Sequence, residues 1–308
     1  MAQYDHELGI IGAGPAGLSA AVYGKRAGLD VVIFDTGFGG GTVTINPMVE
    51  NYLGMDSIPG FELAAKMQAH AEKYVEIIKN EPVSKLEISS DAVKIVTDKR
   101  SPSVGALVFA TGTENRRLGV TGEGKFLGRG VSYCATCDGP FFRNKRIGVV
   151  GGGNSAAIEA LYLKGLSEDV SLIHRRDQLR AEDIYTEQLK KNNVKLILNS
   201  TVEEIYGDEV LKGVKLLDKL EESTSELELD GIFISIGTIP RSELAKDIGV
   251  ELDEGGYIKV DRGMRTNIDR VYAAGDVIGG VRQIVVAAAE GATAALESLR
   301  VLGKQYPF

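Results

Sequence analysis

The sequence contains very few of the residues on which several classes of site depend. Of its 308 residues, none is Trp, two are Cys and three are His. A structural zinc ion takes four ligands, mostly from Cys and His, so we expect no metal site. Apolar runs such as Ile284–Ala289 are far shorter than the roughly 20 residues that span a bilayer, so we expect no membrane helix. The first residues show no basic segment followed by an apolar one, and we expect no secretory signal.

The charge balance is acidic and limits the choice of partner. The formal net charge of −8 argues against non-specific binding of nucleic acid, which needs a basic surface to displace counterions. Hydrophobic content of 44% and charged content of 25% are ordinary for a soluble globular protein. A chain of this length can bury a sizeable core and is expected to form two domains.

The two cysteines stand together in Cys134-Ala135-Thr136-Cys137-Asp138. A pair at this spacing can open and close a small disulfide ring with little movement of the backbone, and such pairs often contain a thiol with a lowered pKa. Asp138 is placed to pass protons to and from the second sulfur. Half a zinc site, a structural disulfide and two unrelated buried cysteines are the alternatives. The CxxC, with no other cysteine, indicates a redox site in a reducing cytoplasm.

The N-terminal region predicts one β-α-β unit. A buried strand over 6–11 precedes Gly12-Ala13-Gly14-Pro15-Ala16-Gly17, then come a helix to about Leu29 and a strand over 30–35. In this context GxGxxG is typical of a dinucleotide site, with a tight turn, close approach of the backbone to a pyrophosphate, and close packing of helix on strand. The helix N-terminus favours phosphate, and Asp35 is placed to accept a hydrogen bond from a ribose hydroxyl. A glycine-rich turn without a ligand is the alternative.

The next stretch gives weaker signals. It predicts a loop over 37–60, an amphipathic helix from Phe61 to about Ile78, a short strand over 92–96 and a buried strand over 104–112. That last strand ends in Ala110-Thr111-Gly112, which suggests that its end passes close to a ligand.

A second nucleotide motif follows the cysteines. A strand over 146–150 leads into Gly151-Gly152-Gly153-Asn154-Ser155-Ala156 and a helix to about Leu166, so we expect two nucleotide-binding domains. The next strand, over 169–173, ends in His174-Arg175-Arg176, with Arg180 further on. Guanidinium groups there would bind a 2′-phosphate and favour NADP over NAD, whereas an ordinary basic strand end is the alternative.

The C-terminal part predicts a return to the first domain. Several strands over 194–237 are followed by Pro240, and a strand over 270–276 ends in Gly275-Asp276 before a helix from about Arg282 to Leu302. Asp276 is placed to hydrogen-bond a ribityl hydroxyl of a flavin.

In their order and spacing, these motifs resemble those of the low-molecular-weight, flavin-containing thioredoxin reductases of bacteria and archaea. The resemblance extends from the first strand to the last helix. It implies an α/β fold of two Rossmann-like nucleotide-binding domains, the FAD/NAD(P)-linked disulfide reductase fold, with the second inserted in the first. The expected domains are residues 1–115 and 242–308 for FAD and 116–241 for NADPH and the CxxC. It also implies a homodimer.

The resemblance assigns roles to residues by their motifs. Cys137 would face the flavin, Cys134 would attack the disulfide of a thioredoxin-like protein, and Asp138 would be their acid–base partner. Electrons would pass from NADPH through FAD to this disulfide, with a rotation of the inserted domain about crossings near 113–116 and 240–242. The cofactor-binding residues implied are Gly12, Gly14, Ala16, Gly17, Asp35, Asn51, Ala110, Thr111, Gly112, Gly275, Asp276, Arg282 and Gln283 for FAD, and Gly151, Gly153, Asn154, Ser155, His174, Arg175, Arg176 and Arg180 for NADPH.

One segment departs from the family pattern. The family usually has a Gly-Gly-Gln segment beside the flavin, and here the sequence reads Gly37-Phe38-Gly39-Gly40-Gly41-Thr42. Some archaeal relatives use a deazaflavin reductant, but they lack the basic motif at 174–180. Three competing functions each fit only part of the pattern. A flavin-dependent dithiol oxidase would not need that basic motif, a ferredoxin–NADP reductase has no use for the cysteines, and a non-catalytic dinucleotide sensor would not need the CxxC.

Overall fold

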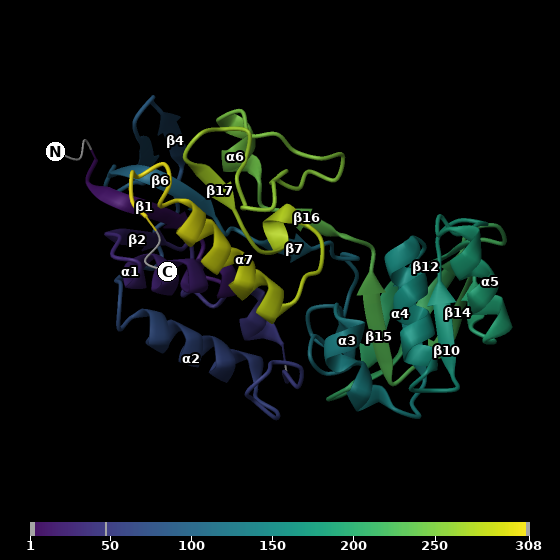
Figure 1. The fold of residues 1–308 in the computed structure, drawn as a ribbon. Helices are drawn as coiled ribbons and strands as arrows, with labels where there is room; N and C mark the ends of the chain where they lie inside the picture. Colours follow the sequence, from purple (N-terminus) through teal and green to yellow (C-terminus); the bar gives the residue numbers. More distant parts are fainter. Residues whose placement is uncertain (1–3, 47, 306–308) are drawn as a thin grey trace. The chain divides into compact units, whose positions relative to one another are not determined.

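The chain runs through one folding unit, leaves it for a second, and then returns to the first (Figure 1). The computed structural model describes residues 4–46 and 48–305. Unit 1 takes in the chain up to Glu114 and from Ile239 onward, and unit 2 takes in Asn115–Thr238. The sequence predicts these two divisions after residues 115 and 241. Each unit contains its own hydrophobic clusters and its own mostly parallel sheet.

Unit 1 is built on a sheet in the strand order β3-β2-β1-β6-β5-β4, with β17 also paired to β6. Its strands are β1 (His6–Ile11), β2 (Val31–Phe34), β3 (Ile77–Ile78), β4 (Lys85–Ile88), β5 (Val93–Val96), β6 (Ser103–Phe109) and β17 (Val271–Ala273). The β1, β2, β3, β6 and β17 pairings are parallel, and β4 and β5 add antiparallel strands. Along β2, alternate residues enter different clusters: Ile33 packs with α1 and α7, and Phe34 packs with Ala245 and Val277. Burial on both faces explains why these strands are continuous apolar runs.

The helices of unit 1 follow local signals in the sequence. They are α1 (Pro15–Arg26), η1 (Gly41–Ile45), α2 (Gly60–Ala71), α6 (Glu243–Asp247), η3 (Asp276–Ile278) and α7 (Ile284–Glu297). Helix α1 has Pro15 in its first turn, where a missing N–H costs nothing, and Lys25 and Arg26 in its last turn, near the negative end of the helix dipole. Gly28, with a φ of +84°, then lets the chain turn into β2.

Unit 2 repeats the Rossmann-like theme with a parallel sheet in the order β11-β10-β9-β15-β8. Its strands are β8 (Val131–Ser132), β9 (Ile147–Gly151), β10 (Val170–Ile173), β11 (Lys195–Ile197) and β15 (Gly231–Ser235), and its helices are α3 (Ala135–Asp138), η2 (Gly139–Phe142), α4 (Asn154–Lys164) and α5 (Asp183–Lys191). The strands β12 (Ser200–Gly207), β13 (Leu211–Asp218) and β14 (Ser223–Glu228) form an antiparallel sheet of their own.

The two crossings between the units run side by side. Strand β7 (Thr113–Asn115) pairs with β16 (Thr238–Pro240) in a small sheet. Just beyond them, the Arg116 amide donates to the Gly237 carbonyl at 3.0 Å. On the unit 1 side, Arg241 lies 3.6 Å from the Glu114 carboxylate. The chain therefore enters and leaves unit 2 at neighbouring points.

Several predicted elements need correction. The helix predicted from Phe61 to about Ile78 ends at Ala71, and Ile77–Ile78 is instead the strand β3 beside β2. The last helix runs from Ile284 to Glu297, shorter than predicted at both ends. The strand predicted over 6–11 is confirmed as β1. Among the described residues, no helix combines the length and apolar character needed to cross a bilayer.

Candidate active site

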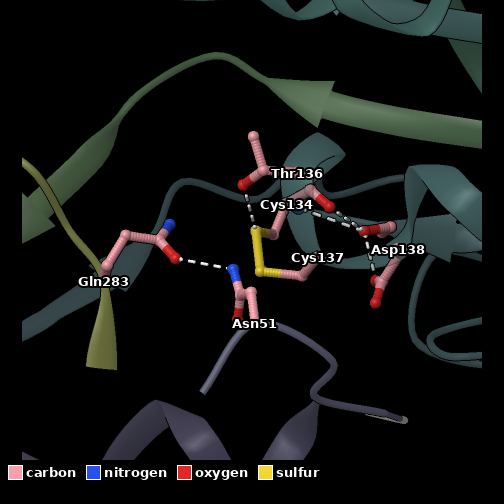
Figure 2. The surroundings of a disulfide bond; sticks show 7 residues. Asn51, Cys134, Thr136, Cys137, Asp138 and Gln283 are labelled. Carbon is pink, nitrogen blue, oxygen red and sulfur yellow. Dashed lines mark hydrogen bonds between the residues drawn. A yellow bond between two sulfur atoms is a disulfide. The ribbon is translucent and has the colours of Figure 1, made fainter. Parts of the chain in front are cut away.

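The only two cysteines are joined in a disulfide between Cys134 and Cys137, which closes a small ring at the start of α3 (Figure 2). Strand β8 ends at Ser132, and the chain then turns so that Cys134 precedes the single turn of α3. Both cysteines are half-buried, and the hydroxyl of Thr136 lies 3.5 Å from the sulfur of Cys134. The ring is thus held in the body of unit 2 while both sulfur-bearing residues keep some exposure.

Asp138 directly follows the ring and is buried, with 7% of its surface exposed. Its Oδ2 accepts a hydrogen bond from the Ser132 hydroxyl at 2.6 Å. Its Oδ1 is buried and has no hydrogen-bond partner among the described residues. Burial raises the pKa of Asp138 above its ordinary value, and the hydrogen bond from Ser132 acts in the opposite direction. A carboxyl group in this state can hold a proton at a higher pH than an exposed aspartate can.

A second buried carboxylate, that of Glu123, holds Tyr133, the residue before Cys134, in place. It accepts hydrogen bonds from the Leu118 and Gly119 amides at 2.9 and 2.8 Å and from the Tyr133 hydroxyl at 2.6 Å. Burial raises the pKa of Tyr133, and the hydrogen bond to Glu123 adds to this, so the phenol stays protonated. The segment leading into Cys134 is therefore tied to the stretch that follows the first crossing.

The first glycine-rich loop has the close approaches that its motif predicts. A Cβ on Gly17 would lie 1.8 Å from the Gly12 carbonyl oxygen, and one on Gly12 would lie 2.3 Å from the Ala110 carbonyl oxygen. Gly14, by contrast, would meet only the Cα of Gly41, at 3.7 Å. The loop is thus closed on its inner side and has room on its Gly14 side, at the N-terminus of α1.

Asp35 braces this loop at the end of β2. Its carboxylate accepts hydrogen bonds from the Ala13 amide at 2.7 Å and from the Gly37 amide at 2.8 Å. A carboxylate has about four acceptor positions, so these two bonds leave capacity for a ribose hydroxyl. The geometry gives Asp35 a structural role that the sequence alone did not indicate.

The C-terminal part brings Gly275 and Asp276 to the same end of the unit 1 sheet. Strand β17 pairs with β6, and a Cβ on Gly275 would lie 2.9 Å from the Cβ of Ala16 in α1. The Gly275 amide donates to the carboxylate of Glu290 on α7 at 2.8 Å. Burial raises the pKa of both Asp276 and Glu290. The Asp276 turn is therefore held between α1 and α7.

The remaining predicted flavin-site residues of unit 1 take part in hydrogen bonds, a tight turn or a charge interaction within that unit. The side chain of Asn51 donates to that of Gln283, the residue before α7, at 3.0 Å (Figure 2). The Thr111 hydroxyl donates to the Arg241 carbonyl at 2.6 Å, and Gly112 has a φ of +68°. The charge of Arg282 lowers the pKa of Asp276, against the larger effect of burial.

The second glycine-rich loop is joined to the start of α5. The amide group of Asn154 donates to the Glu182 carboxylate at 2.7 Å and accepts from the Glu182 backbone at 2.9 Å. The Arg180 and Ala181 amides both donate to the Gly152 carbonyl. A Cβ on Gly153 would meet nothing within 4 Å, so this side of the loop has room at the N-terminus of α4, where Ser155 is exposed.

The four predicted residues of the basic motif divide into two kinds. Arg175, Arg176 and Arg180 are exposed, whereas His174 is 5% exposed and lies beneath Gly152, whose Cβ would come within 2.1 Å of its ring. Burial lowers the pKa of His174, and the charges of Arg180 and Arg176 add to this, although hydrogen bonds to the backbone oppose it. The geometry thus makes His174 a neutral support for the loop and leaves the arginines to meet an anion.

Comparison with known proteins identifies the family. Residues 6–291 match the model of the pyridine nucleotide-disulphide oxidoreductases. The chain belongs to this family. It is 41% identical over 94% of its length to a thioredoxin reductase of Listeria monocytogenes, covering 91% of that protein, and 39% identical over 96% to one of Mycoplasma genitalium, covering 95%. The crystal structure of thioredoxin reductase from Streptococcus pyogenes superposes with a TM-score of 0.91 at 40% identity, over 98% of this chain and 99% of that one.

The residues present fit the two dinucleotides expected of a pyridine nucleotide-disulphide oxidoreductase. The open sides of Gly14 and Gly153, each at a helix N-terminus, leave the space a pyrophosphate needs. The exposed arginines after β10 supply charge for a further phosphate. Within the described part of the chain, no group of three or more His, Cys, Asp or Glu side chains is arranged to hold a metal ion.

The sequence did not predict the residues that hold the motif residues in place by hydrogen bonds. Ser132, Glu123, Glu182 and Glu290 each hold a motif residue or its neighbour through a short hydrogen bond. Polar residues in otherwise apolar runs were the available signal, as with Ser132 at the end of β8 and Glu290 in an Ala-rich helix. Their partners, however, are set by tertiary contacts.

Proposed function

We propose that this protein is an NADPH-dependent thioredoxin-disulfide reductase. The observation that carries the proposal is the closed Cys134–Cys137 ring with the buried Asp138 beside it, in a chain with two dinucleotide-type loops. A disulfide of this kind, next to a group that can exchange protons, is suited to thiol–disulfide exchange. The names of the relatives support thioredoxin as the partner.

The two cofactors are assigned to different units in this proposal. Unit 1 would hold FAD through Gly12, Gly14, Ala16, Gly17, Asp35, Asn51, Ala110, Thr111, Gly112, Gly275, Asp276, Arg282 and Gln283. Unit 2 would hold NADPH through Gly151, Gly153, Asn154, Ser155, Arg175, Arg176 and Arg180, with His174 supporting the loop. When bound, the two cofactors supply the two electrons that reduce the disulfide ring.

The residues of the ring act in thiol–disulfide exchange. Reduction breaks the bond between Cys134 and Cys137, and Asp138 supplies a proton to one of the two sulfurs. The Cys134 thiolate then attacks the disulfide of thioredoxin and forms a mixed disulfide. Cys137 resolves it, which releases reduced thioredoxin and closes the ring again.

The location and assembly are also proposals. We place the protein in the cytoplasm, because its only cysteines form a redox-type CxxC and no disulfide framework is present in the sequence. We propose a homodimer on the family resemblance, and sedimentation velocity tests it.

A serine variant of Cys134 tests the function. In an anaerobic titration with NADPH, the flavin of the wild-type protein should bleach and two thiols per chain should appear. Cys134→Ser should keep the bleaching and lose thioredoxin reduction, because the attacking thiolate is gone. Retained thioredoxin reduction in Cys134→Ser would contradict the assignment of this residue.

The same titration separates the possible reductants. NADH and a reduced deazaflavin take the place of NADPH in parallel samples. Bleaching by the deazaflavin alone would keep the dithiol and overturn the choice of NADPH. Rapid use of oxygen without thioredoxin would indicate a dithiol oxidase.

A further inference from the structure

Ser132 links the disulfide ring to Asp138 by a directed chain of hydrogen bonds. It is the last residue of β8 and is 3% exposed. The Cys134 amide donates to its Oγ at 3.0 Å, and this hydroxyl donates to Oδ2 of Asp138 at 2.6 Å. A hydroxyl has one proton to donate. The other acceptor near it, the Cys134 carbonyl, is 3.5 Å away, so Oδ2 is the favoured acceptor.

These hydrogen bonds give the two carboxylate oxygens of Asp138 different surroundings. Oδ2 is occupied as an acceptor, whereas Oδ1 is buried without a hydrogen-bond partner among the described residues. A proton placed on Oδ2 would force the Ser132 hydroxyl to turn to the more distant Cys134 carbonyl. A proton on Oδ1 leaves every bond in place and removes the cost of an unpartnered buried charge.

We propose that Ser132 is a positioning residue that fixes the Asp138 carboxyl group so that Oδ1 carries the proton exchanged with the cysteines. The inference rests on the proposed function of the ring as a redox disulfide. When an external thiolate attacks one ring sulfur, a new S–S bond forms and the Cys134–Cys137 bond breaks. The sulfur that leaves as a thiolate takes the proton from Oδ1. Asp138 becomes a carboxylate and is reprotonated by solvent.

The electrostatics give the direction of the expected effect. Burial raises the pKa of Asp138, and the Ser132 hydrogen bond, which favours the charged form, lowers it. Loss of the hydroxyl should therefore raise this pKa further. The two cysteines, once reduced, are the titratable groups of the ring itself. Helix α4, which packs against α3, carries Glu159, Tyr162 and Lys164, and the segment before the ring carries Tyr133 with its partner Glu123. All of these side chains are the same in every variant below.

The experiment measures reduction of the ring by dithiothreitol in the holoenzyme, without NADPH or thioredoxin. Protein thiols are trapped with a maleimide at intervals and counted by mass spectrometry, and each rate is divided by the thiolate concentration of dithiothreitol. For the wild type, the corrected rate should fall as pH rises through the pKa of Asp138, because the proton donor is lost. Asp138→Asn should show no such midpoint.

Ser132→Ala should move the midpoint upward by about one pH unit, as expected for one lost hydrogen bond to a charged group. Ser200→Ala is the matched control, since Ser200 is also buried in unit 2 but donates to a backbone carbonyl, that of Leu198. Its midpoint should equal that of the wild type. The pair Ser132→Thr and Ser132→Val serves if Ser132→Ala does not fold, because the two side chains have nearly the same shape and only Thr keeps the hydroxyl.

Each outcome decides the proposal. A Ser132→Ala midpoint equal to that of the wild type overturns it, and so does a midpoint that survives in Asp138→Asn. Equal midpoints for Ser132→Thr and Ser132→Val overturn it as well. If the shift is present but NADPH does not drive thioredoxin reduction, the proposed function fails and the role of Ser132 stands.

Discussion

At the scale of single residues, the end of β10 shows how one short motif serves two purposes. His174 turns inward under Gly152, where burial and neighbouring arginines keep its ring neutral. Arg175 and Arg176 follow it and are exposed. The inward residue supports the glycine-rich loop, and the outward residues provide positive charge next to it. A change at His174 should therefore disturb the loop for any dinucleotide, whereas a change at the arginines should affect only a ligand with an extra phosphate.

The double variant Arg175→Ala/Arg176→Ala should bind NADPH about 10- to 100-fold more weakly, because charge-assisted hydrogen bonds to the 2′-phosphate are lost. Its affinity for NADH, which lacks this phosphate, should stay nearly the same. Isothermal titration calorimetry measures both affinities. Lys190→Ala, another exposed cation of unit 2, is the control and should change neither. Equal losses for NADPH and NADH would show that the arginines do not read the phosphate.

The sequence predicted the residues that carry the motifs better than those that support them. Glycine spacing and the CxxC follow from local geometry, so Gly12, Gly17 and the ring were found from the sequence. The burial of His174 and the contact between Ser132 and Asp138 depend on how strands and helices pack. The residue type alone does not determine which way a side chain points at the end of a strand.

At the scale of elements, the packing of α1 against α7 joins an early and a late segment of the chain in one site. A Cβ on Gly291 would lie 2.0 Å from the Ala16 carbonyl oxygen, so the two helices meet at backbone distance. The preceding residue, Glu290, accepts from the Gly275 amide. One turn of α7 therefore fixes the glycine-rich loop of α1 and the Asp276 turn together.

Gly291→Ala should destabilise unit 1 by about 1–3 kcal/mol, the usual range for an added methyl group in a tightly packed place. It should also weaken FAD binding, since α1 and the Asp276 turn would move apart. Urea unfolding followed by circular dichroism, and flavin release measured by fluorescence, give the two values. Gly124→Ala is the control, because a Cβ there meets nothing within 4 Å. Unchanged stability in Gly291→Ala would mean that the helices can separate at little cost.

Helices and strands were predicted well where neighbouring residues in the sequence determine them, and poorly where pairing with a distant strand determines them. The strand over 6–11 and the helix after it follow from an apolar run, a proline and small residues, and the structure places β1 and α1 there. The amphipathic pattern predicts a helix from Phe61 to about Ile78, since apolar residues continue at helical spacing. The last of these, Ile77 and Ile78, instead pair with Ile33 and Phe34 of β2. Hydrogen bonds offered by an existing strand outweighed the helical pattern.

At the scale of the whole molecule, unit 2 is an insertion whose two ends lie next to each other. Strands β7 and β16 pair at the crossings, and paired strands are about 5 Å apart. Each unit has hydrophobic clusters made of its own residues. A unit with its own core and adjacent ends can fold without the rest of the chain.

Residues 115–238 expressed alone should fold and unfold cooperatively, because the parallel sheet and the disulfide ring lie within this segment. Thermal unfolding followed by circular dichroism, together with amide dispersion in an NMR spectrum, tests this. The same segment carrying Leu172→Asp, which places a charge in the core, is the control and should be unfolded. A spectrum of an unfolded chain from the wild-type segment would mean that unit 2 needs unit 1 as a template.

Strand β14 lies at the edge of the antiparallel sheet of unit 2, and nearly all of its residues are exposed. An open edge has unpaired backbone groups that can join the sheet of another molecule. Here the edge carries Glu226 and Glu228, with Glu221 and Glu222 just before it. Two such edges brought together would set carboxylates against carboxylates. The acidic character of this strand should therefore keep concentrated protein from forming sheet-to-sheet aggregates.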